Sequence, residues 1–168
     1  MKKTNAVRIL DNLGIAYSIR EYEVDPEDLT AATVARKIGL PLEQVFKTLL
    51  VTTAPGEFAF AVLPGDAELD FKKLARAAGA RKASMVGLKD LQPLTGYIRG
   101  GVTVLGASKN FPAFADTTIE RFDLISVSAG LRGMQILLSP GDYLRATGAA
   151  VAGLRKEDGG GLLGEEPA

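Results

Sequence analysis

The stretch Gln44-Val45-Phe46-Lys47-Thr48-Leu49-Leu50-Val51 is followed closely by the turn sequence Ala54-Pro55-Gly56-Glu57. Apolar and β-branched residues dominate the stretch, and a second apolar run follows the turn over residues 58–63. Two such runs joined by a Pro-Gly turn are typical of a β-hairpin. This hairpin is the element around which we expect the rest of the chain to fold.

Lys47 is the residue of this hairpin that most needs a physical explanation. Because side chains alternate along a strand, Lys47 shares a face with Leu49 and Val51. An ammonium group among apolar side chains loses hydration free energy unless it has a partner or opens on a pocket. Lys47 therefore either holds an anion in a pocket or points outward from an edge strand, where lysine hinders aggregation. The stretch alone leaves both interpretations open.

Helices and strands surround the hairpin without a strict βα alternation. Helical spacing, N-cap residues and terminating glycines predict helices over residues 4–13, 31–38 and 71–78, a helix or turn over 88–94, and a last helix from 140 to about 148. Apolar runs predict further strands over residues 16–23, 114–116, 124–128 and 134–138, the last two as a second hairpin. We expect an α+β fold with a largely antiparallel, mixed sheet or barrel-like core flanked by helices.

The length of 168 residues suits one compact domain. We expect this domain to span residues 1–152. The remaining residues 153–168 are rich in Gly and Glu, and such a terminus is expected to be mobile.

The residues that are missing narrow the chemistry. The chain has no cysteine and no histidine, which excludes a Cys nucleophile, a Ser-His-Asp triad and any disulfide. The usual ligands of zinc, haem and iron–sulfur clusters are absent as well, so we expect no metal and no cofactor. The N-terminus lacks a secretory apolar region, and no apolar run approaches the ~20 residues of a membrane span. We therefore expect a cytoplasmic protein without a membrane partner.

The charge is balanced over the chain but uneven along it. Lys and Arg together number 20, as do Asp and Glu, whereas residues 72–109 hold eight basic side chains and the single acidic residue Asp90. Such a basic segment can attract a polyanion locally. It can equally be a solvated surface whose charge is balanced by acidic neighbours in space.

Two further stretches can bear chemistry. The glycine loop, residues 95–110, includes Gly96, Gly100 and Gly101, whose backbone can approach a ligand closely, but it matches no phosphate-binding loop. Ser128, which Ala129 and Gly130 follow after an apolar strand, could form a Ser-Lys dyad with Lys47. The alternatives are a plain flexible loop and ordinary turn chemistry.

Taken together, these stretches resemble the bacterial YbaK-type Cys-tRNA(Pro) deacylases. Those proteins belong to the aminoacyl-tRNA editing domains related to the insertion domain of prolyl-tRNA synthetase. The resemblance covers roughly residues 4–150, and five stretches in the family's order carry it: Tyr22-Glu23-Val24-Asp25-Pro26, residues 44–51, Leu69-Asp70-Phe71-Lys72-Lys73-Leu74-Ala75, residues 95–101, and Val127-Ser128-Ala129-Gly130-Leu131-Arg132-Gly133.

The resemblance implies hydrolysis of the ester between a wrong amino acid and the 3′-terminal adenosine of a tRNA. It implies that Lys47 holds the tRNA 3′ end through phosphate, and that the backbones of Gly100 and Gly130 polarise the ester carbonyl. Ser128 is implied as a further catalytic position. The implied substrate-binding residues are Tyr22, Thr48, Tyr97, Gly101 and Arg132.

The resemblance also implies the mechanism and the partners. An aminoacyl ester is already activated, so positioning and backbone polarisation suffice, and the thiol of a cysteinyl substrate can itself attack the carbonyl. The expected partners are tRNA(Pro), whose acceptor stem would face residues 72–109, and prolyl-tRNA synthetase.

Two departures leave the substrate open. Val104 stands where the family usually has proline, and Gln135 stands where it usually has aspartate. Editing of alanine or another small amino acid therefore remains an alternative, as do a non-catalytic module that binds the tRNA 3′ end and a covalent hydrolase that uses Ser128 and Lys47.

Overall fold

The computed structural model describes residues 3–157. Its helices are α1 (Asn5–Asn12), α2 (Ala31–Ile38), α3 (Phe71–Ala78), α4 (Leu88–Thr95) and α5 (Pro140–Thr147), with 3₁₀ turns η1 (Leu42–Gln44) and η2 (Thr117–Arg121). Its strands are β1 (Ser18–Glu21), β2 (Phe46–Ala54), β3 (Glu57–Pro64), β4 (Ser84–Met85), β5 (Ala113–Asp116), β6 (Ile125–Ser128), β7 (Met134–Leu138) and β8 (Ala150–Ala152).

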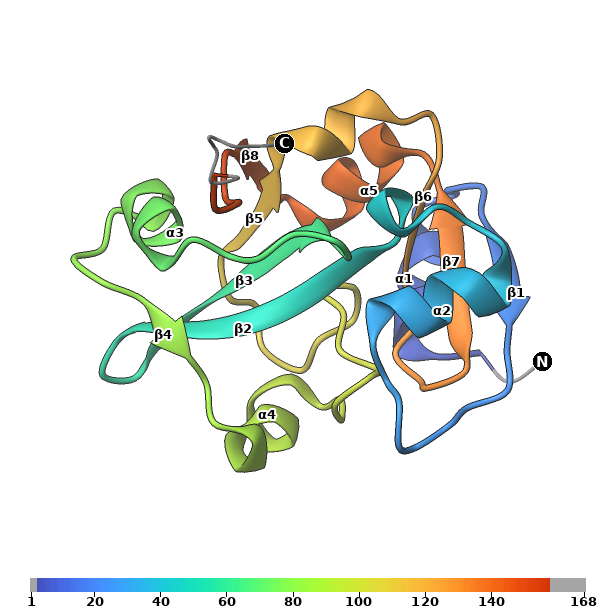
Figure 1. Cartoon of the computed structure of the whole chain (residues 1–168), viewed down its shortest axis with the longest axis horizontal. Coiled ribbons are helices and arrows are strands. Elements are labelled where there is room, and N and C mark those ends of the chain that lie inside the picture. The colour runs from blue at the N-terminus through green and yellow to red at the C-terminus, as the bar shows by residue number, and fades with distance from the viewer. Residues whose placement is uncertain (1–2, 158–168) are drawn as a thin grey trace.

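The strands form two sheets. A five-stranded sheet has the order β4-β2-β3-β5-β8, with antiparallel pairs around β2 and parallel pairs on both sides of β5. A three-stranded antiparallel sheet has the order β1-β7-β6. A parallel bridge between Val45 and Ser126 joins the two sheets. The predicted α+β class and the central hairpin are confirmed, and β2 and β3 form the long ribbon that crosses the middle of Figure 1.

Local capping fixes the helix ends close to where the sequence predicts them. Thr30 caps α2 by accepting a hydrogen bond from the Thr33 N–H, and Asp70 caps α3 by accepting from the amides of Lys72 and Lys73. Both helices end at a glycine in the left-handed conformation, Gly39 and Gly79. These short-range contacts define where α2 and α3 begin and end.

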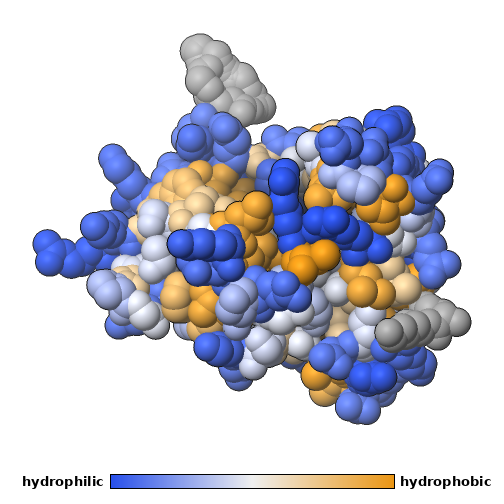
Figure 2. Space-filling model, turned by 90° about the horizontal axis from the view of Figure 1, so that it is seen from below, coloured by the Kyte–Doolittle hydropathy of each residue, from blue (hydrophilic) through white to orange (hydrophobic). Residues whose placement is uncertain are grey.

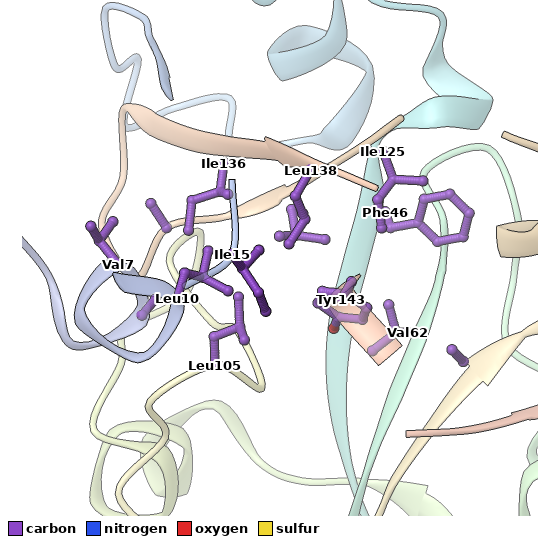
Figure 3. Packing of buried hydrophobic residues seen from close by; sticks show 14 of the residues in the cluster. Val7, Leu10, Ile15, Phe46, Val62, Leu105, Ile125, Ile136, Leu138 and Tyr143 are labelled. Carbon is purple, nitrogen blue, oxygen red and sulfur yellow. The ribbon is translucent and has the colours of Figure 1, made fainter. Parts of the chain in front are cut away.

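The largest hydrophobic cluster lies between the two sheets. Figure 3 shows side chains of α1, the β6–β7 hairpin and the β2–β3 ribbon converging on one another, including Leu10, Ile136, Phe46 and Val62. Tyr143 of α5 is fully buried beside them. In Figure 1, α2 lies in front of β7 and α1 lies behind it, so the small sheet is covered on both faces. This packing holds the two sheets in a fixed relation.

The folded part extends beyond the boundary that the sequence suggests at residue 152. Leu154 is fully buried, and its N–H donates to Asp116 Oδ1 at 2.8 Å. Arg155 Nε lies 3.2 Å from Asp116 Oδ2, and the Lys156 N–H donates to the Glu68 carbonyl. Residues 153–157 are therefore part of the packed domain, and the rest of the predicted tail lies outside the described residues.

The helices of the described chain are short. None of those within residues 3–157 has the length and apolar character needed to cross a bilayer.

Candidate active site

A cavity of about 650 Å³ opens beside β2, between the start of α2, the segment from β4 to α4, and the glycine loop. Its size is within the range of pockets that enclose small organic ligands. The lining is mostly apolar, with polar and charged groups at Thr30, Lys47, Thr48, Arg99, Ser128 and Gln135. Four of the residues expected at the site, Lys47, Thr48, Gly100 and Ser128, are thus brought together.

The backbone of β2 contributes to the cavity wall. On the side away from β3, the Leu50 carbonyl accepts a hydrogen bond from the Val86 N–H. Because hydrogen-bonding direction alternates along an antiparallel strand, the N–H and C=O of Thr48 face the same side. Within residues 3–157, β4 pairs with β2 only at Val51 and Thr52, so Thr48 faces the cavity rather than a strand. Its backbone groups are available to a ligand.

Lys47 lies at the cavity wall, half-buried, with its ammonium group held by backbone oxygens. Its Nζ lies 2.6 Å from the Ala67 carbonyl oxygen and 3.4 Å from that of Gly65. Burial lowers the pKa of Lys47, and the neighbouring carboxylates of Asp66 and Glu68 oppose that shift. Lys47 is therefore half-buried at the cavity wall and bonded to backbone carbonyls rather than extended into solvent.

Gly65 positions the carbonyls that hold Lys47. A Cβ atom at residue 65 would lie 2.6 Å from Leu42 Cδ1 and 2.7 Å from Ala31 Cβ. The Gly65 N–H also donates to the Val45 carbonyl at 2.7 Å. The loop after β3 therefore passes closely under the start of α2, and only a residue without a side chain fits there.

The glycine loop forms the opposite wall of the cavity. Gly100 has a φ of +90°, a conformation that favours glycine, and its backbone lines the cavity. Arg132 donates from Nε to the Arg99 carbonyl at 2.8 Å and so ties the loop to the β6–β7 turn. Arg132 itself is not among the lining residues and acts here on the loop.

Ser128 stands at the end of β6 in a tight turn. Its Oγ accepts a hydrogen bond from the Gly130 N–H at 3.1 Å. The hydrogen bond from Gly130 uses one lone pair of Ser128 Oγ, so the Ser128 O–H remains free to donate a hydrogen bond to a ligand. Lys47 Nζ donates to the carbonyls of Gly65 and Ala67, and no hydrogen bond joins Lys47 to Ser128 among the described residues. The geometry therefore gives no support to a Ser-Lys dyad.

Several residues that the resemblance places in the pocket lie behind its wall. Tyr97 is 8% exposed, and its hydroxyl donates to the Leu105 carbonyl at 2.7 Å. Burial raises the pKa of Tyr97 to about 12. Gly130 packs against the Tyr97 ring, and Gly101 packs against the backbone of Gly130. These three residues are not among those that line the cavity; Tyr97 and Gly101, which belong to the glycine loop, pack against Gly130 of the β6–β7 turn.

Tyr22 also lies away from the cavity lining. It is partly buried and packs beside α2 in the small cluster that contains Val34 and Ile38. The Tyr22 N–H donates to the Gly133 carbonyl at 3.0 Å. In this structure Tyr22 supports α2 and the β6–β7 turn.

The structure adds contributors that the sequence did not single out as site residues. Gly65 and Ala67 provide carbonyls, and Met85 and Leu88 form an apolar part of the lining while remaining 48% and 62% exposed. Figure 2 views the molecule from the side on which α4 lies in Figure 1 and shows apolar patches among charged side chains there.

The electrostatic character of the cavity is positive. Among residues 3–157, the charged side chains that line it are Lys47 and Arg99. Thr30, Ala31 and Ala32 also line it, so the positive end of the α2 dipole opens on the same space. The described residues contain no group of three or more carboxylates placed to hold a metal ion. The arrangement is suited to hold an anionic ligand beside polar backbone groups.

Comparison with known proteins decides the family. The model of the aminoacyl-tRNA editing domain matches residues 25–146. The chain belongs to this family. The match covers α2, the β2–β3 ribbon, the glycine loop and the β6–β7 hairpin, which are the elements that build the cavity.

Two relatives of this chain are named as tRNA deacylases. An Enterococcus faecalis protein named "Putative Cys-tRNA(Pro)/Cys-tRNA(Cys) deacylase EbsC" is 40% identical over 151 residues, which is 90% of this chain and 92% of that protein. The Escherichia coli K12 "Multifunctional Ser/Thr-tRNA deacylase ProXp-y" is 28% identical over 101 residues, 60% of each chain.

Solved structures show the same fold. Hypothetical protein APE2540 superposes with a TM-score of 0.83 at 23% identity, covering 91% of this chain and 100% of that one. A structure described as "a putative trans-editing enzyme for prolyl tRNA synthetase" gives 0.79 at 24% identity, covering 93% and 99%. The family match and the named relatives confirm the predicted activity: this editing domain is an aminoacyl-tRNA deacylase, an enzyme that hydrolyses the aminoacyl ester.

Proposed function

We propose that this editing domain acts in trans on mischarged tRNA(Pro) and removes cysteine from it. The observation that carries the proposal is the cavity that Lys47, Gly100 and Ser128 line together. The Enterococcus faecalis relative, whose name includes Cys-tRNA(Pro), is 40% identical and aligns over 90% of this chain. That name supports the choice of amino acid and tRNA.

In this proposal Lys47 anchors the phosphate at the tRNA 3′ end. An ammonium group has three N–H donors, and the carbonyls of Gly65 and Ala67 accept from Lys47 Nζ. A remaining donor and the positive charge are then available to an anion. Arg99 and the start of α2 add positive potential on the same side, which favours a phosphate at this position.

The proposed chemistry is assisted by the substrate. The ester carbonyl lies against the backbone near Gly100, which polarises it, and Ser128 Oγ donates to a substrate oxygen. The cysteinyl thiol attacks the carbonyl carbon, the ester C–O bond breaks, and the thiol proton passes to the ribose oxygen. Binding holds thiol and carbonyl in the reactive geometry, which is the main source of acceleration.

A second candidate substrate is tRNA carrying another small amino acid, such as alanine or serine. The name of the Escherichia coli relative supports this candidate, because it refers to Ser/Thr-tRNA. For these amino acids the attacking group is a water molecule rather than a thiol: its hydroxyl joins the carbonyl carbon, the ester C–O bond breaks, and its proton passes to the ribose oxygen. A synthetase pocket separates such small amino acids by only about 1–3 kcal/mol, so each of them needs editing.

We further propose how the tRNA body and the synthetase are engaged. The basic segment 72–109 runs from α3 through α4 to the glycine loop and contributes Arg99 to the cavity. It would contact the acceptor stem while the 3′ end enters the cavity. Prolyl-tRNA synthetase, the enzyme that produces mischarged tRNA(Pro), is the proposed protein partner.

Deacylation of Cys-, Ala-, Ser- and Pro-tRNA(Pro) by wild type and by Lys47→Met tests the proposal. We expect hydrolysis of Cys-tRNA(Pro) by wild type and its loss in Lys47→Met with the fold retained. Lys37→Met is the matched control, because Lys37 Nζ also donates to a backbone carbonyl, that of Glu23, but lies outside the cavity. Full activity of Lys47→Met would refute the role of Lys47.

Two further results would identify the alternatives. An intact aminoacyl ester on all four tRNAs, together with measurable tRNA binding, would point to a module that binds the 3′ end. An acyl adduct on Ser128 in the mass spectrum of a quenched reaction would point to covalent catalysis.

A further inference from the structure

Gln135 is a buried polar residue in an otherwise apolar strand, and it lines the cavity. It is 5% exposed and pairs across the β6–β7 hairpin with Ser128. Its neighbours along the strand, Met134 and Ile136, pack into the main hydrophobic cluster. Since side chains alternate, Gln135 faces away from that cluster and toward the cavity.

The orientation of the Gln135 carboxamide follows from its hydrogen bond. The hydroxyl of Ser126, itself fully buried, donates to Gln135 Oε1 at 2.7 Å. This bond directs the amide NH₂ away from Ser126, and within residues 3–157 that NH₂ donates no hydrogen bond to another protein group. Within residues 3–157, the Tyr143 hydroxyl is the fully buried side-chain polar atom that lacks a hydrogen-bond partner. The Gln135 nitrogen is not in that class, so it is not sealed from solvent. The Gln135 nitrogen therefore reaches the cavity with its donors free.

The cavity has no anionic side chain for an α-ammonium group among its described lining. Lys47 and Arg99 are cationic, the start of α2 is positive, and Gln135 offers a neutral donor. Asp66 and Glu68, which lie near Lys47, are exposed and are not part of the lining. The free amine of an aminoacyl ester thus finds two cationic side chains and no anionic one among the described lining.

We infer that this enzyme also hydrolyses aminoacyl-tRNA esters whose α-nitrogen is acylated, at a rate within roughly threefold of that of the free-amine ester or higher. Acylation converts the ammonium into a neutral amide and adds a carbonyl oxygen. That oxygen is an acceptor for the free donors of Gln135. A cavity of about 650 Å³ has room for the small acyl group in addition to the ester.

The reaction on an N-acylated substrate is the same ester hydrolysis as in the proposed function, and the two substrates differ only in the group on the α-nitrogen. Water adds across the ester: its hydroxyl joins the carbonyl carbon, its proton passes to the ribose oxygen, and the amide bond stays intact. With a cysteinyl substrate the thiol attacks first, and water then opens the resulting thiolactone. The inference rests on the proposed function because it uses the same cavity and the same ester.

The deciding experiment compares Cys-tRNA(Pro) with N-acetyl-Cys-tRNA(Pro) on the wild-type enzyme, with the uncatalysed rates subtracted. The expected result is an N-acetyl rate that is equal to the free-amine rate within roughly threefold, or higher. An N-acetyl rate lower by more than this overturns the inference and leaves the proposed function standing. Hydrolysis of neither substrate overturns both.

A variant tests whether Gln135 determines this preference. Gln135→Glu keeps the size of the side chain and the acceptor for Ser126 but places a carboxylate in the cavity. It should raise the ratio of free-amine to N-acetyl rates by roughly ten- to a hundredfold, the effect of one hydrogen bond to a charged group. Asn12→Asp, at the exposed end of α1, outside the cavity and outside residues 72–109, is the matched neutral-to-acidic control and should leave the ratio unchanged.

A third variant keeps the test decisive if the buried carboxylate prevents folding. Gln135→Leu introduces no charge and removes the donors, so it should slow the N-acetyl substrate more than the free-amine substrate. An unchanged ratio in a folded Gln135→Glu or Gln135→Leu protein would overturn the assignment to Gln135.

Discussion

Replacing Gly65 by alanine should damage the site through the loop that holds Lys47. The added Cβ would lie 2.6 Å from Leu42 Cδ1 and 2.7 Å from Ala31 Cβ, and each contact must open to about 3.4 Å to be ordinary. Leu42 can rotate away, but Ala31 is short and belongs to the first turn of α2. The Val45 carbonyl, 3.1 Å from the same Cβ, restricts the loop on its other side. The loop and α2 must therefore separate.

The magnitude follows from that overlap. Overpacking of a well-packed site typically costs about 1–3 kcal/mol, which for a domain of this size lowers Tm by about 2–12 °C. The carbonyls of Gly65 and Ala67 move with the loop, and Lys47 Nζ follows them. A displacement of about 1 Å at a reacting group can reduce the rate by roughly a hundredfold. We expect the loss of deacylation to exceed what the loss of stability explains.

The assay combines thermal unfolding with deacylation measured well below Tm, where every variant is folded. Gly141→Ala is the matched control, because Gly141 lies in α5 with a φ that suits any residue and no atom near its added Cβ. It should be neutral or slightly stabilising. A Gly65→Ala protein with wild-type Tm and wild-type deacylation would show that the loop carries no such constraint.

Two other predictions concern buried and capping groups. Tyr143→Phe should leave the free energy of unfolding unchanged or raise it by up to about 1 kcal/mol in chemical denaturation, because burial raises the pKa of Tyr143 and its sealed hydroxyl has no partner. Thr48 lies near enough to the Tyr143 hydroxyl to oppose that pKa shift, but the two side chains are not in hydrogen-bonding geometry. A marked destabilisation by Tyr143→Phe would show that a Tyr143–Thr48 hydrogen bond forms in solution. The hydroxyls of Thr33 and Thr30 lower the pKa of Asp28 to about 2, so its stabilising effect is complete above the unfolded pKa near 3.9 and is lost as pH falls toward about 2. Carbon-13 NMR titration of the Asp28 carboxyl group measures this directly, and a pKa near 3.9 in the folded protein would contradict it.

The sequence predicted the elements whose signals are local. Thr30 with Gly39, and Asp70 with Gly79, define α2 and α3 because each cap contacts only the helix that it begins or ends. The two-residue β4 and the three-residue β8 carry no pattern of their own. They are strands because β2 and β5 present edges to them. Strands of this kind depend on tertiary contacts that no short stretch encodes.

The site was predictable to the extent that a residue conflicts with its surroundings. Lys47 is a charge in an apolar strand, and that conflict is what singled it out; the structure places it at the cavity wall, and its role there stays a prediction. Gly65 gave no such signal, because its role depends on Leu42 and Ala31, which reach it only in the folded chain. Tyr97 was placed in the pocket by resemblance, whereas its ring supports Gly130 and its hydroxyl is used by Leu105.

The cavity exists because β4 is short. If β4 continued its antiparallel register along β2, the residue facing Thr48 would come from the position where α4 instead begins, at Leu88. The chain turns into a helix there, and the outer edge of β2 is left open between Val45 and Leu50. An open edge normally invites pairing with another chain. Here α2, the glycine loop and the half-buried Lys47 narrow access to it. The same unpaired backbone that would be a hazard on an exposed edge thus forms a cavity wall whose hydrogen-bonding groups are available to a ligand.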